Sequence, residues 1–185
     1  MAEYYEMKIA GLDRKLKKCP VSDKLDIAAF IMFSDVEVTV KSAEQLLAKA
    51  PEFDVILTAE CKGIPLAYEM ARQSGKTYVV ARKSVKLYMQ GVVSVNVKSI
   101  TTTNEQVLHL DGEKAELLKD KKVLVVDDVI STGESLKALE YLVEKAGGTV
   151  AGRAAVLAEG DAADRTDIIY LEKLPLFNSD GTVKA

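Results

Sequence analysis

The sequence predicts an α/β protein whose core is a doubly wound parallel sheet. Two observations support this prediction. Short runs rich in β-branched residues alternate with amphipathic helical segments, and the strand-like runs are apolar along their whole length. Continuous apolar strands need cover on both faces, and helices between parallel strands supply it. The 185 residues, 48% of them hydrophobic, suit a single domain, residues 1–185, with a core of its own.

Five apolar runs are predicted to be strands of this sheet, at residues 53–60, 76–83, 121–128, 149–158 and 167–177. Three helices are predicted beside them, at residues 42–50, 64–75 and 134–148. The middle helix has Pro65 near its start and Gly75 at its end, which is the usual asymmetry of helix termini. The last helix places Leu136, Leu139 and Leu142 on one face, as a helix packed on a sheet requires.

Two regions fall outside this alternation. Residues 22–33 predict a short strand and turn, and the basic run at residues 14–18 is expected to be a solvated face before the first strand. Between residues 84 and 106 the helical pattern disappears, and frequent Val, Ile and Thr predict a β-hairpin. Residues 106–110 are strand-like and are expected to lead away from this hairpin, so we expect a structural role for His109.

Composition and charge argue against several classes of function. The formal net charge is −3, whereas general nucleic-acid binders have a basic excess. No stretch is apolar enough to span a bilayer and the N-terminus lacks a secretory signal, so we expect a cytoplasmic protein without membrane contact. Cys19 and Cys61 belong to no CxxC pair, so we expect reduced thiols and no metal or disulfide framework.

The most informative segment is VLVVDDVISTGES, which runs from Val123 to Ser135. Asp127 and Asp128 end a buried strand at the edge where parallel sheets bind ligands. Gly133 can adopt a backbone conformation that other residues resist, and N–H groups in such a turn before a helix form a cradle for anions. Together, the two acids and the turn predict a site for a sugar diol that carries a phosphate. Hydroxyls in the turn are expected to cap the helix as well.

Other phosphate-binding motifs do not match. The chain has neither GxxxxGK[ST] nor a GxGxxG after a strand, so a P-loop hydrolase and a dinucleotide-binding fold are not supported. The segment resembles the phosphoribosyl pyrophosphate signature of the type I phosphoribosyltransferases, in which four hydrophobic residues precede two acids and a T-G-x-[ST] loop. The resemblance implies that Asp127 and Asp128 contact the ribose hydroxyls at the catalytic centre. It also implies that the 5′-phosphate is bound by Ser131, Thr132, Gly133, Glu134 and Ser135.

The same resemblance extends to the architecture around the signature. It implies the type I phosphoribosyltransferase fold, with a small N-terminal hood in residues 1–35 and a mobile flap in residues 84–106. Flap closure would exclude water, so that ribosyl transfer is favoured over hydrolysis of the donor. Dimers are usual in the resembled family, so we expect a homodimer.

Two earlier strand ends resemble the pyrophosphate site of the adenine branch. LTAECKGIPLA is similar to its E-x-R-G turn, and the matching residues are Glu60, Cys61, Lys62 and Gly63. Lys62 replaces an arginine, which keeps the charge but not the bidentate fork. ARKSVKLYM is similar to the RK-x-x-KL segment, and the matching residues are Arg82, Lys83 and Lys86. The resemblance implies that these cations stabilise the leaving pyrophosphate, with Lys86 counted among the catalytic residues. Mg²⁺ would be the cofactor, bound mainly through the substrate.

The hood resembles a purine-binding segment. IMFSDVE is similar to the V-F-R-D-I segment of adenine phosphoribosyltransferases, in which Phe33 would stack on the base and Met32 would bind its edge. A core position is the alternative for Phe33. Ser34 replaces a frequent arginine, Thr102 lies near the position of a flap glutamate, and Glu105 is displaced from it. The resemblance of the hood, the pyrophosphate turn and the RK segment to the adenine branch makes adenine the first expectation, while these departures leave xanthine, hypoxanthine and guanine open.

The predicted activity is transfer of a ribosyl group from phosphoribosyl pyrophosphate to a ring nitrogen of a purine base. The products would be a nucleoside monophosphate and pyrophosphate. One alternative is a regulator that binds phosphoribosyl pyrophosphate without catalysis, although the residues before Ile27 are too few for a winged helix and the chain is acidic. Another is an orotate or uracil enzyme, which would differ in the base pocket.

Overall fold

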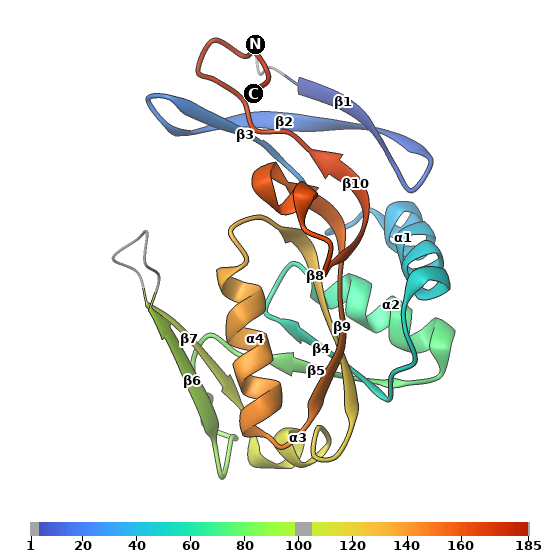
Figure 1. Cartoon of the computed structure of the whole chain (residues 1–185), viewed down its shortest axis with the longest axis vertical. Coiled ribbons are helices and arrows are strands. Elements are labelled where there is room, and N and C mark those ends of the chain that lie inside the picture. The colour runs from blue at the N-terminus through green and yellow to red at the C-terminus, as the bar shows by residue number, and fades with distance from the viewer. Residues whose placement is uncertain (1–3, 99–104, 185) are drawn as a thin grey trace.

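The computed structural model describes residues 4–98 and 105–184 and confirms the predicted α/β fold (Figure 1). Five strands form a parallel sheet in the order β10-β9-β8-β4-β5. These strands are β4 (Val55–Ala59), β5 (Thr77–Ala81), β8 (Lys122–Ile130), β9 (Thr149–Glu159) and β10 (Ile169–Leu174). Each of the five predicted apolar runs coincides with one of them, although β8 and β9 extend one or two residues beyond the predicted ends.

Helices cover both faces of this sheet, as Figure 1 shows. On one face lie α1 (Val36–Lys49) and α2 (Ile64–Ser74), and on the other lies α4 (Glu134–Lys145). A short helix, α3 (Gly112–Glu116), precedes β8, and a 3₁₀ turn, η1 (Gly160–Asp164), joins β9 to β10. The arrangement is therefore doubly wound, as the continuous apolar strands predict.

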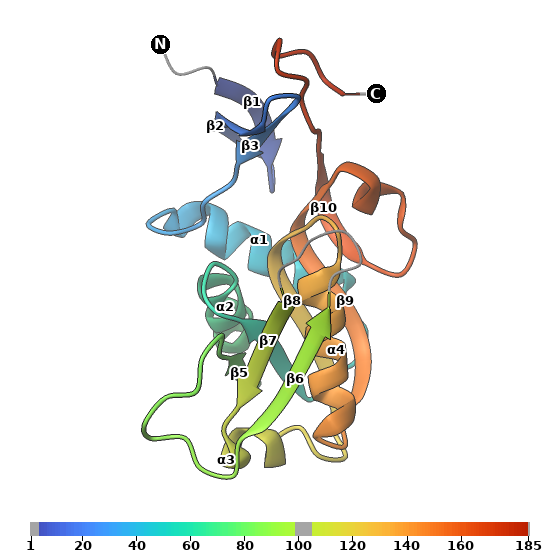
Figure 2. The ribbon, with the colours of Figure 1, turned by 90° about the vertical axis from the view of Figure 1, so that its left-hand side faces the viewer.

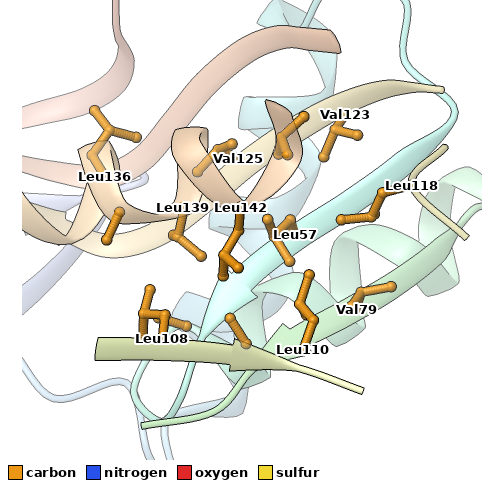
Figure 3. Close-up of a cluster of buried hydrophobic side chains, with 14 of the residues drawn as sticks. Leu57, Val79, Leu108, Leu110, Leu118, Val123, Val125, Leu136, Leu139 and Leu142 are labelled. Atoms are coloured by element: carbon orange, nitrogen blue, oxygen red, sulfur yellow. The ribbon is translucent and has the colours of Figure 1, made fainter. Parts of the chain in front are cut away.

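Each face of the sheet has its own hydrophobic core. Figure 3 shows the core under α4, where Leu136, Leu139 and Leu142 pack against Leu57 and Val125 of the sheet. The three leucines are those that the sequence places on one helix face. The core on the opposite face joins α1 and α2 to the sheet and also includes residues from the N-terminal strands. Successive residues of the central strands therefore point into the two cores in turn. This explains why these strands are apolar along their whole length.

The N-terminal region forms a separate antiparallel sheet, here called the hood sheet. Its strands are β1 (Tyr4–Ile9), β2 (Leu12–Ser22) and β3 (Leu25–Ala29), in the order β1-β2-β3, and Figure 2 shows them at one end of the molecule. The expectation that residues 14–18 precede the first strand is wrong, because they lie within β2. Leu16 is buried while Lys15 and Lys17 beside it are exposed, so this strand has one solvated face.

Helix α1 begins earlier than predicted, at Val36 instead of residue 42. Val36, Val38 and Val40 alternate with polar residues, a pattern that favours a strand. Asp35 overrides this preference by capping the helix, because its side chain accepts a hydrogen bond from the Val38 amide at 3.1 Å. Arg14 of β2 holds Asp35 with two hydrogen bonds of 2.7 and 3.0 Å and so ties the hood sheet to the helix.

The predicted β-hairpin is present, but its second strand differs from the expectation. The strands β6 (Val93–Lys98) and β7 (Glu105–Leu110) pair antiparallel, and both pack beside α4 (Figure 2). The segment at 106–110 does not lead away from the hairpin, because it belongs to β7. His109 accordingly pairs with Ser94 across the hairpin, where its Nδ1 lies 2.7 Å from the serine Oγ. Thr102 lies outside the described residues.

The strand order reverses between β4 and β8. From β4 the chain moves outward to β5, and it then returns to β8 on the other side of β4 before continuing to β9 and β10. In open parallel sheets a crevice forms at such a reversal, beyond the carboxyl ends of the strands. The two strands that flank this reversal end at Ala59 and Ile130, next to the predicted pyrophosphate turn and the signature segment.

Candidate functional site

The acid pair lies at the strand-order reversal, near the end of β8. Asp128 is buried, with 3% of its surface exposed, and Asp127 beside it is half-buried. The Asp128 amide donates a hydrogen bond of 2.9 Å to Asp127 Oδ1, which fixes the first carboxylate against the strand. Asp128 Oδ2 is buried and lies 3.1 Å from Lys62 Nζ, but it accepts no hydrogen bond of good geometry among the described residues. The pair therefore presents acceptor capacity toward the crevice.

Asp127 has a strongly perturbed carboxyl group. Burial raises the pKa of Asp127 well above its usual value of 3.8, and repulsion from the neighbouring Asp128 raises it further. The ammonium of Lys62 acts in the opposite direction. Strongly shifted carboxyl groups in a crevice are typical of sites that bind or transform a ligand.

The turn after the acid pair forms a small concavity. Residues 129–136 and Asp127 line a cavity of about 50 Å³ that leads into α4. Gly133 is the N-cap of α4 and has a φ of +79°, in the left-handed region that glycine adopts without strain. The first turn of a helix presents backbone N–H groups and the positive end of the dipole, so this cavity suits an anion.

The turn at residues 60–63 packs directly against the acid pair. The peptide bond between Glu60 and Cys61 is cis, and Gly63 follows as the N-cap of α2. A Cβ atom at Gly63 would lie 3.1 Å from Asp127 Oδ1 and 2.4 Å from Thr58 Oγ1, so only glycine fits here without a shift of its neighbours. Lys62 Nζ lies 3.1 Å from Asp128 Oδ2 and so joins the two strand ends across the crevice.

Glu60 connects this turn to the next strand end. Its Oε1 accepts a hydrogen bond of 2.7 Å from the Lys83 amide, and its Oε2 lies 3.0 Å from Arg82 Nε. The side chain of Lys83 is exposed. Lys86 lies further along the loop, where its ammonium contacts Ser84 Oγ at 2.5 Å. The structure therefore brings Glu60, Lys62 and the acid pair together, whereas the Lys86 ammonium contacts its own loop.

Two further charged residues at this edge were missed by the sequence analysis. Glu159 ends β9, next to β8, and burial raises the pKa of its carboxyl while Lys62 lowers it. Its position at a strand end beside the acid pair is the signal that could have revealed it. The second is Arg165, which follows η1 and lies against Gly133, with its Nη1 2.7 Å from the position of a glycine Cβ. No pattern in the sequence indicates this contact, because the residues are separated by α4 and β9.

The two residues predicted to bind the base lie between β3 and α1. Met32 is fully buried in the core beneath α1 and α2, so only its backbone can contact a ligand. Phe33 has 46% of its surface exposed, and the alternative of a core position is therefore wrong. Ser34 has a φ of +69°, which turns the chain sharply before the α1 cap. An exposed aromatic ring beside such a turn is available for stacking.

Among the described residues, no group of three or more histidine, cysteine or carboxylate side chains is placed to hold a metal ion. Asp128 Oδ2, which pairs with Lys62, is one hard oxygen ligand at the crevice. A single carboxylate fits Mg²⁺ that is carried by phosphate groups of a ligand.

No helix in the described part of the chain is long and apolar enough to cross a membrane.

An acid pair, an anion cradle and a cation-bearing turn lie together at one strand-order reversal, an arrangement suited to a ligand with hydroxyls and phosphate groups. Comparison with known proteins gives the family. Residues 38–176 match the model of the phosphoribosyl transferase domain. Adenine phosphoribosyltransferase from Kosmotoga olearia is 36% identical over 132 residues, which are 66% of this chain and 74% of that protein. The chain belongs to the phosphoribosyltransferase family and is therefore a glycosyltransferase that transfers a pentosyl group.

Other relatives cover more of the chain. A hypoxanthine/guanine phosphoribosyltransferase from Methanothermococcus okinawensis is 29% identical over 181 residues, or 90% of this chain and 95% of that protein. Among solved structures, adenine phosphoribosyltransferase from Thermoanaerobacter pseudethanolicus has a TM-score of 0.65 at 27% identity and covers 77% of this chain and 84% of its own. The expected type I phosphoribosyltransferase fold is thereby confirmed.

Proposed function

We propose that this chain transfers the 5-phosphoribosyl group of phosphoribosyl pyrophosphate to a ring nitrogen of a purine base, releasing pyrophosphate. The observation that carries the proposal is the convergence of the acid pair, the turn at Gly133 and the turn at Lys62 around one crevice. Adenine is the favoured base, because adenine phosphoribosyltransferases predominate among the relatives and the hood segment is similar to theirs. The hypoxanthine/guanine relatives make these bases the second candidates.

The donor would lie along the carboxyl edge of the sheet. Asp127 and Asp128 would accept hydrogen bonds from the two ribose hydroxyls, and the turn that runs from Ser131 through Thr132, Gly133 and Glu134 to Ser135 would bind the 5′-phosphate. The acid pair and the turn lie side by side, as the ring hydroxyls and the 5′-phosphate do in the ribose. Fixing both ends of the sugar orients its anomeric carbon for displacement, and orientation alone supplies a large part of catalysis in such reactions.

The pyrophosphate would leave toward the turn at residues 60–63 and the segment after β5. Lys62 pairs with Asp128 at the crevice, and Glu60 holds the Arg82 guanidinium and the Lys83 backbone amide. Cations at this position stabilise negative charge as it develops on the leaving group. Lys86 would join them through movement of its loop. Mg²⁺ bound to the donor would add positive charge at the same place, and Asp128 is the residue that would contact it.

The base would approach the anomeric carbon from the hood. The exposed ring of Phe33 supports stacking on a purine, and the buried side chain of Met32 leaves its backbone to contact the base edge. The flap in residues 84–106 would complete the site by excluding water. We also propose a homodimer, as in the resembled family.

The experiment is an assay of pyrophosphate release with phosphoribosyl pyrophosphate, Mg²⁺ and one base at a time: adenine, hypoxanthine, guanine, xanthine, uracil or orotate. We expect turnover with a purine, and loss of that turnover in Asp128→Asn. Asp13→Asn is the matched control, because Asp13 is exposed on the hood sheet and pairs only with the surface residue Lys8 among the described residues. Tight donor binding without turnover for any base would contradict the proposal and favour a regulator, which a salt-sensitive DNA-binding measurement would then test.

A further inference from the structure

Arg165 lies outside the signature segment and yet against its phosphate turn. A Cβ atom built on Gly133 would lie 2.7 Å from Arg165 Nη1, so the guanidinium covers the glycine at the start of α4. Its other two nitrogens form a fork with Asp167, in which Nε donates to Oδ1 at 2.9 Å and Nη2 to Oδ2 at 2.8 Å. Nη1 is therefore the nitrogen that faces the turn.

Successive ion pairs that begin at Asp167 hold the Arg165 guanidinium in place. Asp167 also lies 3.9 Å from Nε of Arg153 on β9, and Arg153 in turn pairs with Glu140 on α4. The four side chains connect the helix, the strand and the loop after η1. Pairing with Asp167 raises the pKa of Arg165 above its usual value, so the positive charge beside Gly133 is permanent. The network thus holds one cation in a fixed place at the turn.

This position is unfavourable for a cation that has only a structural role. The N-terminus of α4 carries the positive end of the helix dipole, where acidic groups stabilise a helix and basic groups do not. A half-exposed ion pair such as Arg165–Asp167 contributes little stability to compensate. An anion bound in the turn would make this position favourable for a cation, because the helix dipole and the guanidinium would then attract the same negative charge.

The geometry points to Arg165 as a specificity residue whose charge strengthens binding of the donor's 5′-phosphate. This inference rests on the proposed function, since it assumes that the turn around Gly133 holds that phosphate. It adds a cation from outside the signature to a turn that otherwise offers backbone N–H groups and hydroxyls. The protein would thereby discriminate a 5′-phosphorylated ribose from an unphosphorylated one more strongly than the turn alone allows.

The test compares Arg165→Gln, Arg165→Lys and wild type in binding of ribose 5-phosphate and of pyrophosphate by titration calorimetry. Arg72→Gln is the matched control, because Arg72 forms a similar fork with Glu69 on α2. We expect Arg165→Gln to weaken ribose 5-phosphate binding about tenfold while the pyrophosphate affinity changes less than about twofold. Arg165→Lys should keep most of the affinity, and added salt should reduce the difference between wild type and Arg165→Gln.

Each outcome decides a separate point. If wild type binds ribose 5-phosphate and Arg165→Gln binds it equally well, the inference is overturned and the proposed function is unaffected. If wild type turns over phosphoribosyl pyrophosphate but binds no ribose 5-phosphate, the inference is overturned and the proposed function stands; if it shows neither turnover nor binding, both fail. Equal weakening of both ligands by Arg165→Gln would show a structural effect and would also overturn the inference. A melting temperature within a few degrees of wild type verifies that the variant is folded.

Discussion

Gly63 provides the sharpest test of how the site is assembled. Its φ of −73° and ψ of −12° are accessible to alanine, so Gly63→Ala introduces no backbone strain. The added methyl group would lie 2.4 Å from Thr58 Oγ1, about 1 Å short of ordinary contact, and 3.3 Å from the Asp127 Cα. Thr58 is fully buried and Asp127 Cα belongs to the central strand, so neither can yield easily.

The expected cost follows from these contacts. Overpacking of this kind costs about 1–3 kcal/mol. Lower entropy of the unfolded chain returns about 0.4–1 kcal/mol when alanine replaces glycine at a compatible position. We therefore expect Gly63→Ala to lower the free energy of unfolding by about 1–2 kcal/mol. We also expect kcat/KM for the donor to fall by at least about tenfold, because the turn carrying Lys62 must move away from Asp127.

Urea denaturation and steady-state kinetics measure the two effects, and two double variants identify their cause. Thr58→Ala removes the nearest clashing atom, so Gly63→Ala should cost less in that background than in wild type. Thr58→Val keeps an atom at the same place, so the cost of Gly63→Ala should persist. If Gly63→Ala alone unfolds within about 0.5 kcal/mol of wild type with unchanged kinetics, the turn is not packed as described and the reasoning is refuted.

Two further predictions concern the signature segment. Gly133→Ala should lower the free energy of unfolding by about 1–2 kcal/mol, because its φ is left-handed and Arg165 occupies the methyl position; thermal melting measures this, and an unchanged melting temperature would contradict it. The raised pKa of Asp127 means that the folded state retains this proton better than the unfolded state, so stability from this group falls as pH rises above 3.8. Asp127→Asn should therefore gain stability relative to wild type between about pH 5 and pH 8 in urea titrations, and a constant difference would refute the assignment.

The sheet and the position of the site could be predicted because both depend on local patterns. Val123 to Val126 are apolar in succession, which requires burial on two sides, and a strand of that kind places Asp127 at the ligand-binding edge. The turn at Gly133 is marked by the residue type itself, since its positive φ favours glycine. In both cases neighbours in the chain carry the necessary information.

The errors arose where contacts between distant segments decide the structure. Residues 14–18 form a strand because Leu16 alone enters the core while β1 and β3 pair on either side. Val36 to Val40 form a helix because Asp35 caps it and Arg14 holds that cap. Arg165 reaches Gly133 only after α4 and β9 have folded back. None of these partners can be identified from the local pattern around the residue concerned.

The hood sheet has a consequence for how this protein can diversify. It is a separate sheet, not hydrogen-bonded into the five parallel strands, and Phe33 lies where its last strand leads into α1. The acid pair and the phosphate turn belong to the parallel sheet instead. On the proposed function, base recognition and donor binding are thus carried by different modules. Under this proposal, substitutions at exposed hood positions such as Phe33 are expected to change the preferred base while the acid pair and the phosphate turn keep their positions in the parallel sheet.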